Sequence, residues 1–258
     1  MRGLLATALL LLIQADTVPR YGAGQLHCAV FRETVIGELR GRVGRSIRQE
    51  RLGRSGVLVV AAAPADSALS VEVWYDSLSV WRETPAGREE ADTEGLLGGR
   101  WVGRLMPFGR WVGVRAPFVP DEVLAFADLG PLLEDFFPRL PSRVLARGAA
   151  DSSEGRALRW ERPRAGPHRL RWSLRVEADV VAPVGDSLAA PLRQEIREEG
   201  AITWSPSKGP IGWERTVSTT VRPRLADGGS AGREAVVTQR IRVVRLPDRR
   251  GCELLGHA

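Results

Sequence analysis

Strict alternation of apolar and polar residues runs through RLRWSLRVEAD, residues 169–179. The apolar positions are Leu170, Trp172, Leu174, Val176 and Ala178, and the positions between them are charged or hydroxylated. Successive side chains of a β-strand point to opposite faces, so this pattern predicts a strand with one buried and one hydrated face. The stretch therefore indicates a β protein whose sheet has an apolar inner side.

Similar stretches extend over most of the chain. Strands are expected at 35–48, 54–63, 68–82, 96–105, 110–117, 155–162, 192–205, 211–222 and 233–246. Short turn sequences such as Pro85-Ala86-Gly87 separate them, and connections this short favour antiparallel hairpins because parallel neighbours need long crossovers. The sequence predicts a mainly β fold, either a single curved antiparallel sheet or a half-open β-barrel of about ten strands.

One segment, about 120–138, departs from the alternation. Its apolar residues recur at roughly helical spacing: Val123, Phe126, Leu129, Leu133, Phe136 and Phe137, followed by Leu140. Pro120 suits a first helical position, whereas Pro131 forbids one continuous helix. We expect two short helices, near 120–127 and 129–137, with their apolar face packed on the sheet.

Six of the eight tryptophans flank predicted hairpin turns in pairs: Trp101 with Trp111, Trp160 with Trp172, and Trp204 with Trp213. Aromatic side chains on the two arms of a hairpin can meet across the strands. Core packing is the favoured role for these rings. If the protein binds an apolar ligand, the candidate contact residues are these six tryptophans with Phe126, Leu133 and Phe137.

The N-terminal residues have the layout of a secretory signal peptide. Met1-Arg2-Gly3 is basic, Leu4 to Ile13 is apolar apart from Thr7, and the chain then turns polar. A membrane span needs roughly 20 apolar residues, about twice this run. We expect cleavage between residues 15 and 24 and export to the periplasm or the extracellular space. The mature 25–258 chain, without a transmembrane span, forms a single β-rich domain or two similar halves (about 30–119 and 155–246) joined by the helical segment.

The chain has two cysteines, Cys28 and Cys252, near the two ends of the expected mature protein. In an oxidising compartment an even pair is more often bridged than free. The sequence therefore predicts a disulfide, which requires Cα atoms within about 7 Å of each other.

The basic balance of the chain does not point to nucleic acid. Lysine and arginine total 37 against 31 acidic residues, a net charge of +6. A nucleic-acid interface gathers basic side chains on one patch with aromatic residues between them. In this chain, arginines and acidic residues are interleaved along the sequence. Solvated strand faces are the favoured interpretation, and no nucleic-acid partner is expected.

No catalytic motif is complete. Gly185-Asp186-Ser187-Leu188 spells the nucleophile block of GDSL esterases, but that family also uses an asparagine and this chain has none. Asp-Ser is a turn-forming pair in its own right. The three histidines, His27, His168 and His257, are isolated and show no metal-ligand spacing.

The acidic cluster Glu89, Glu90, Asp92 and Glu94 could hold a divalent cation, but it lacks the spacing of a calcium loop. A solvated loop is the favoured interpretation. The sequence therefore assigns no catalytic residue, no metal and no cofactor, and it favours a protein that is not an enzyme.

The layout of the chain resembles the periplasmic lipoprotein-carrier (LolA/LolB-like) fold. The shared features are a leader, about ten antiparallel strands and one helical insertion. The resemblance covers the architecture of residues 30–246 and carries over no site residue. It implies a half-open barrel whose helices line an apolar cavity, and an exported, non-enzymatic carrier for a lipid or lipoprotein acyl chain with peripheral envelope association. Two alternatives stay open: a structural or envelope-assembly protein without a ligand, and a secreted hydrolase with no recognisable motif.

Overall fold

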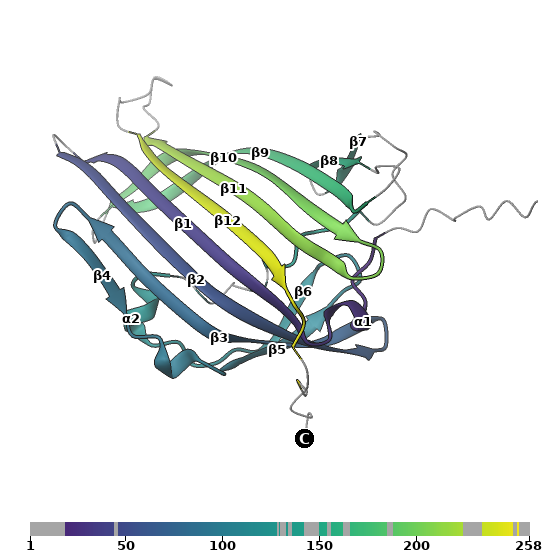
Figure 1. The fold of residues 1–258 in the computed structure, drawn as a ribbon. Helices are drawn as coiled ribbons and strands as arrows, with labels where there is room; N and C mark the ends of the chain where they lie inside the picture. The colour runs from purple at the N-terminus through teal and green to yellow at the C-terminus, as the bar shows by residue number, and fades with distance from the viewer. Residues whose placement is uncertain are drawn as a thin grey trace, which may run out of the picture.

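The computed structural model describes residues 19–43, 46–127, 129, 133, 136–141, 150–153, 156–161, 166–184, 188–223, 234–249 and 252. The expected signal peptide lies outside these residues, apart from its last few positions. Within the described residues, twelve strands form one antiparallel sheet (Figure 1). Their bounds are β1 Ala29–Val43, β2 Ser46–Ala65, β3 Ala68–Thr84, β4 Gly87–Ala91, β5 Arg100–Leu105, β6 Trp111–Arg115, β7 Ala150–Ser153, β8 Arg156–Glu161, β9 His168–Val184, β10 Leu188–Ser205, β11 Gly209–Pro223 and β12 Ala235–Leu246.

The strand order is β6-β5-β3-β2-β1-β12-β11-β10-β9-β8-β7, with β4 pairing β3 beside this path. β6 and β7 stand at opposite ends of the order, so the sheet is not closed. The first and last strands, β1 and β12, pair in its middle from Val30 opposite Leu246 to Gly41 opposite Ala235. The prediction of a curved antiparallel sheet with a short helical insertion is confirmed.

Some predicted strand boundaries were wrong. Strands expected at 35–48 and 54–63 are a long hairpin, β1 and β2, whose arms pair up to Val43 opposite Ser46. Apolar alternation at Val43 and Ile47 continues across this tight turn, so the pattern gives no break there. Strands β4 and β7 were missed because GREEA and ADSS are short and polar.

Of the two expected helices, the first is shorter than predicted, and most of the second, 129–137, lies outside the described residues. Helix α2 spans Asp121–Leu124, directly after Pro120, and Leu133 and Phe136 also have helical backbone. Pro131 lies outside the described residues. The structure adds two short elements, α1 at Ala23–Leu26 and a 3-10 helix at Glu94–Leu96. The insertion packs on the sheet, with its apolar residues buried in the main core: Val123, Leu129, Leu133, Phe136, Phe137 and Leu140.

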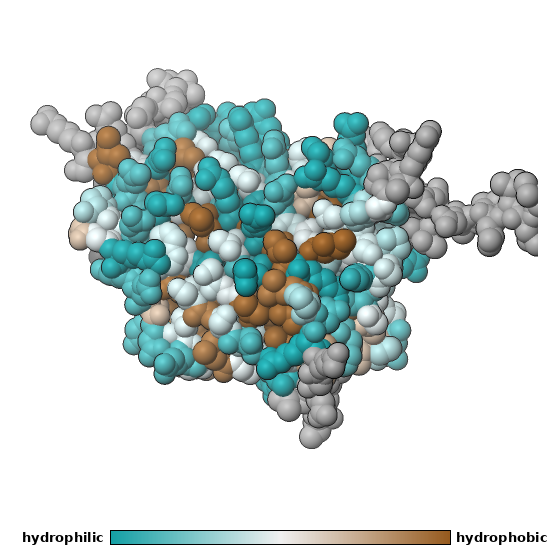
Figure 2. Space-filling model, viewed as in Figure 1, coloured by the Kyte–Doolittle hydropathy of each residue, from teal (hydrophilic) through white to brown (hydrophobic). Residues whose placement is uncertain are grey.

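Alternation along the strands gives the sheet two faces. The inner face carries the main core, with Phe31 on β1, Leu58 on β2, Trp213 on β11 and Val243 on β12. The outer face carries a smaller cluster of Cys28, Val30, Val59, Ala61, Trp74 and Cys252. Figure 2 shows the molecule with β1, β2 and β12 in front, where hydrophobic side chains lie among hydrophilic ones.

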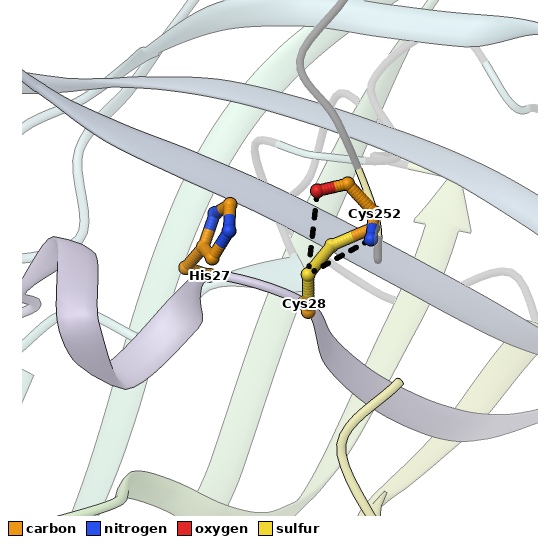
Figure 3. Close-up of side chains that lie close together, drawn as sticks. All are labelled: His27, Cys28 and Cys252. Atoms are coloured by element: carbon orange, nitrogen blue, oxygen red, sulfur yellow. Dashed lines mark hydrogen bonds between the residues drawn. A yellow bond between two sulfur atoms is a disulfide. The ribbon is translucent and has the colours of Figure 1, made fainter. Parts of the chain in front are cut away.

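Cys28 and Cys252 form the predicted disulfide, with Cα atoms 5.5 Å apart. This separation is within the limit of about 7 Å for a disulfide. The backbone N–H of Cys252 also donates a hydrogen bond to Cys28 Sγ over 3.3 Å (Figure 3). The bridge ties the start of β1 to the chain that follows β12. Across the described residues, no helix combines the length and hydropathy that a membrane span needs.

Candidate ligand-binding face

The inner face is closed in one half by aromatic packing. Phe136 makes an edge contact with Trp213, with ring centroids 5.0 Å apart, and a second with Phe31 at 5.8 Å. Phe137 meets Tyr21 at 5.7 Å and stacks on Trp111 at 6.2 Å. These ring contacts show that this half of the face is a packed core. Aromatic pairs in such geometries stabilise a fold beyond the gain from burying their surface.

Most of the predicted ligand-contacting residues lie in this packed half. Six of them are at most 8% exposed: Trp101, Trp172, Trp204, Trp213, Leu133 and Phe137. Trp111 and Phe126 are half-buried and pack against the same cluster. The side chain of Trp160 lies outside the described residues. The structure thus brings the described members of the set together in or against one core, and a role in ligand contact stays a prediction.

The tryptophan pairs do not sit opposite each other in the strand register. Trp204 lies opposite Pro210, and Trp213 lies opposite Ile202. Trp172 lies opposite Gly200 on one side and Leu158 on the other. A Cβ on Gly200 would come within 2.1 Å of the Trp172 ring, so glycine makes room for that indole.

A buried ion pair lies beside the packed half. Glu33 is 2% exposed, and its carboxylate accepts two hydrogen bonds of 3.0 Å from the Arg54 guanidinium and one of 2.8 Å from the Tyr75 hydroxyl. These donors compensate the cost of removing a carboxylate from water. The arrangement fixes neighbouring strands and does not present a free carboxylate for acid–base chemistry.

A second buried carboxylate lies across the sheet. Glu198 on β10 is 4% exposed and accepts a 2.7 Å hydrogen bond from the Trp172 indole N–H. The Arg215 guanidinium lies 3.3 Å from the same carboxylate. Trp172 is therefore held at both ends, by apolar packing and by a charged acceptor.

Both tyrosines of the chain are buried, and this predicts loss of stability at high pH. Burial raises the pKa of Tyr21 and of Tyr75 well above the usual 10.0, and the Glu33 charge raises the pKa of Tyr75 further. In the unfolded chain both phenols ionise near pH 10. A group whose pKa is raised by folding stabilises the fold fully below the unfolded pKa, and the effect is lost as pH rises above it.

We therefore expect the free energy of unfolding to fall above pH 10, by up to about 1.4 kcal/mol per pH unit for each tyrosine. Urea unfolding between pH 8 and 11 measures this slope. In a Tyr21→Phe, Tyr75→Phe double variant the slope should flatten, although its stability at pH 8 is lower because two hydrogen bonds are lost. An unchanged slope in that variant would assign the alkaline sensitivity to other groups.

The other half of the inner face carries exposed apolar side chains. One register row crosses five strands: Leu39 on β1, Val237 on β12, Thr219 on β11, Ile196 on β10 and Val176 on β9. Val176 is 40% exposed and Val237 42% exposed, and the other three are partly buried. We call these five residues the open row.

Sequence reasoning named none of the five residues of the open row as a candidate ligand contact. It placed Val176 on the inner side of its strand by alternation, but alternation does not reveal what covers an inward side chain. Leu170, on the same strand and face, is fully buried. Leu170 belongs to the main core cluster together with the apolar residues of the helical insertion, whereas Val176 does not.

The remaining motifs tested for chemistry are engaged in other contacts or lie outside the described residues. Glu89 pairs with Arg82 at 2.7 Å and Glu90 with Arg88 at 2.8 Å. His27 lies beside the disulfide (Figure 3), with one ring nitrogen and the two sulfurs within 4.8 Å of one another, but the sulfurs are bonded to each other. Residues 185–187 of the Gly-Asp-Ser-Leu sequence, and His257, lie outside the described residues.

Comparison with known proteins gives a structural likeness only. No protein-family model matches the chain, and no curated protein matches it in sequence. The resemblance to lipoprotein carriers therefore rests on architecture. A solved structure titled "Lipid-protein interactions in lipovitellin" is similar, with a TM-score of 0.54 and 10% sequence identity over 91% of this chain. The match covers 27% of the lipovitellin chain, so this protein spans about a quarter of its neighbour's length and shares its fold there.

Proposed function

We propose that this protein is an exported, non-enzymatic carrier that binds the acyl chain of a lipid or lipoprotein on the open row. The observation that carries the proposal is the exposure of aliphatic side chains on the inner face of the sheet, next to a core that is otherwise closed. Exposed apolar surface of this kind on a concave face is typical of ligand sites.

The dimensions of the open row suit an acyl chain. Neighbouring strands lie about 4.8 Å apart, so five strands span roughly 19 Å. The hydrocarbon core of a bilayer is about 30 Å thick, which gives about 15 Å for the acyl chains of one leaflet. One extended chain lying across the strands would therefore cover Val237 and Val176.

Two further observations support the proposal. Lipovitellin, a structural neighbour, is a protein whose solved structure is titled for its lipid–protein interactions. The described buried carboxylates, Glu33, Glu72 and Glu198, are each held by an arginine, which favours binding over acid–base catalysis.

The disulfide is compatible with a periplasmic or extracellular location. Tyr21 packs against Phe137 and Trp204 and donates a hydrogen bond to the Pro138 carbonyl. Cleavage at Gly22-Ala23-Gly24 would remove this buried ring. This favours removal of the leader before Tyr21, and we propose cleavage there.

Matched substitutions on the two faces of β12 test the carrier function. Val237, on the inner face, is 42% exposed, and Val244, on the outer face of the same strand, is 40% exposed. We expect Val237→Asp to weaken binding of the fluorescent fatty acid cis-parinaric acid by about tenfold or more, because it places a charge against the acyl chain. Val244→Asp should leave binding unchanged.

Native mass spectrometry of the protein purified from its own envelope provides a second readout. A co-purifying lipid that is lost in Val237→Asp and retained in Val244→Asp supports the proposal. Equal probe affinity in both variants would overturn it. A protein that binds no fatty acid but self-associates through the open row would favour the structural alternative.

A further inference from the structure

The outer face of the sheet holds a groove of about 740 Å³ that crosses β8, β9, β10, β11, β12 and β1. Trp172, Gly200 and Ile241 lie in its floor, and because the side chains of Trp172 and Ile241 belong to the inner core, the floor there is backbone. The walls of the groove are the outward-pointing side chains on either side of these floor residues. The groove is therefore separated from the open row by the thickness of the sheet.

Five arginines line the groove on the outer face: Arg159 on β8, Arg169 and Arg171 on β9, and Arg240 and Arg242 on β12. The register places them in two groups, because Arg159 lies opposite Arg171, and Arg242 is separated from both by β11 and β10. Glu199 and Glu214 lie between the groups, and Glu214 accepts a 3.2 Å hydrogen bond from the Arg169 guanidinium. Across the groove the charge is thus positive, then negative, then positive.

Two of these arginines differ from others on the same face. Arg159 and Arg242 are exposed and make no ion pair with a described residue. Farther along β9 and β10, Arg175 and Arg197 are each within 3.0 Å of Glu195. Arg159 and Arg242 can therefore take an anion without first breaking an ion pair. Arg169 lies 3.2 Å from Glu214 and Arg171 3.5 Å from Glu161, so these two arginines would exchange or share a carboxylate partner.

We propose that this groove binds an acidic oligosaccharide, with anionic groups held by the two arginine groups and sugar hydroxyls donating to Glu199 and Glu214. Arginine binds carboxylate and phosphate through paired, charge-assisted hydrogen bonds. Arg242 and Arg171 are three strand spacings apart, about 14 Å, so the ligand spans more than one sugar. The small side chain of Ala201, midway between the two groups, leaves room for a sugar ring.

The probe that fits this charge pattern is a hyaluronan hexasaccharide, in which carboxylated and neutral sugars alternate. A galacturonate hexasaccharide, with a carboxylate on every sugar, should bind more weakly because its middle faces Glu199 and Glu214. Isothermal titration calorimetry at low ionic strength compares the two, with neutral maltohexaose as the control. Salt should weaken hyaluronan binding, since the arginines are exposed and screened.

Single substitutions locate the site. Arg171→Gln and Arg242→Gln should each weaken hyaluronan binding by about tenfold, the effect of losing a charge-assisted hydrogen bond. Arg104→Gln, which removes the same charge from the exposed surface of β5, should have no effect. Equal losses in all three variants would indicate a general charge effect and overturn the site.

Three other outcomes would also overturn the proposal: no binding of hyaluronan, tighter binding of galacturonate, or tighter binding of single-stranded DNA of the same length. All substituted side chains are exposed, so an unchanged urea midpoint checks that each variant is folded. This proposal does not depend on the carrier function. Unchanged cis-parinaric acid binding in Arg171→Gln and Arg242→Gln would show that the two sites are separate.

Discussion

Replacing Cys28 and Cys252 together with alanine is expected to lower the free energy of unfolding by about 5 kcal/mol. The bridge joins residues 224 positions apart, and in the chain-entropy model the stabilisation by a disulfide grows with the loop that it closes. The cross-link acts mainly by restricting the unfolded chain. Urea unfolding of the oxidised protein and of the double variant measures the difference.

A reducing agent provides the matched control for this experiment. Dithiothreitol should destabilise the parent protein by a similar amount and leave the double variant unchanged, because the variant has no bridge to lose. If the parent protein unfolds at the same urea concentration with and without reductant, the expected stabilisation is wrong.

Replacing Phe137 with alanine is expected to cost about 3–5 kcal/mol of stability. Phe137 is 1% exposed and contacts the rings of Tyr21, Trp111 and Phe136, so the substitution leaves a cavity among side chains from several parts of the chain. Urea unfolding gives the cost, and cis-parinaric acid binding to the folded variant separates a core role from a ligand role.

Phe118→Ala is the control, since Phe118 is 82% exposed and the same atoms are deleted from the surface. It should change stability by less than about 0.5 kcal/mol. A Phe137→Ala variant that keeps its stability but loses fatty-acid binding would indicate that the ring contacts the ligand and does not stabilise the core.

The fold class could be predicted because its signals are local. Alternation in residues 169–179 indicates one strand by itself, and the apolar spacing around Phe126 and Phe136 indicates a helical cover. Which strands pair with each other is not encoded in local sequence. Nothing in the sequence of β1 or β12 states that they pair in the middle of the sheet, and only the two cysteines hint that the chain ends meet.

The candidate sites were harder to predict for the same reason. Val176 and Leu170 are indistinguishable by alternation, yet one is 40% exposed and the other buried, because coverage depends on where a distant segment packs. Arg159, Arg171 and Arg242 are scattered among acids in the sequence. Register alone gathers them at one groove, so interleaved charges could not be distinguished from a solvated face.

The pairing of β1 with β12 also affects the order in which the sheet can form. As the chain emerges from its N-terminus, β1 can pair with β2 at once, but its other edge waits until residues 235–246 are available. Until then the molecule consists of two half-sheets, each with an unpaired strand edge that could add a strand from another copy. Pairing of β12 with β1 therefore determines whether the two half-sheets join into one sheet or associate with other copies of the chain.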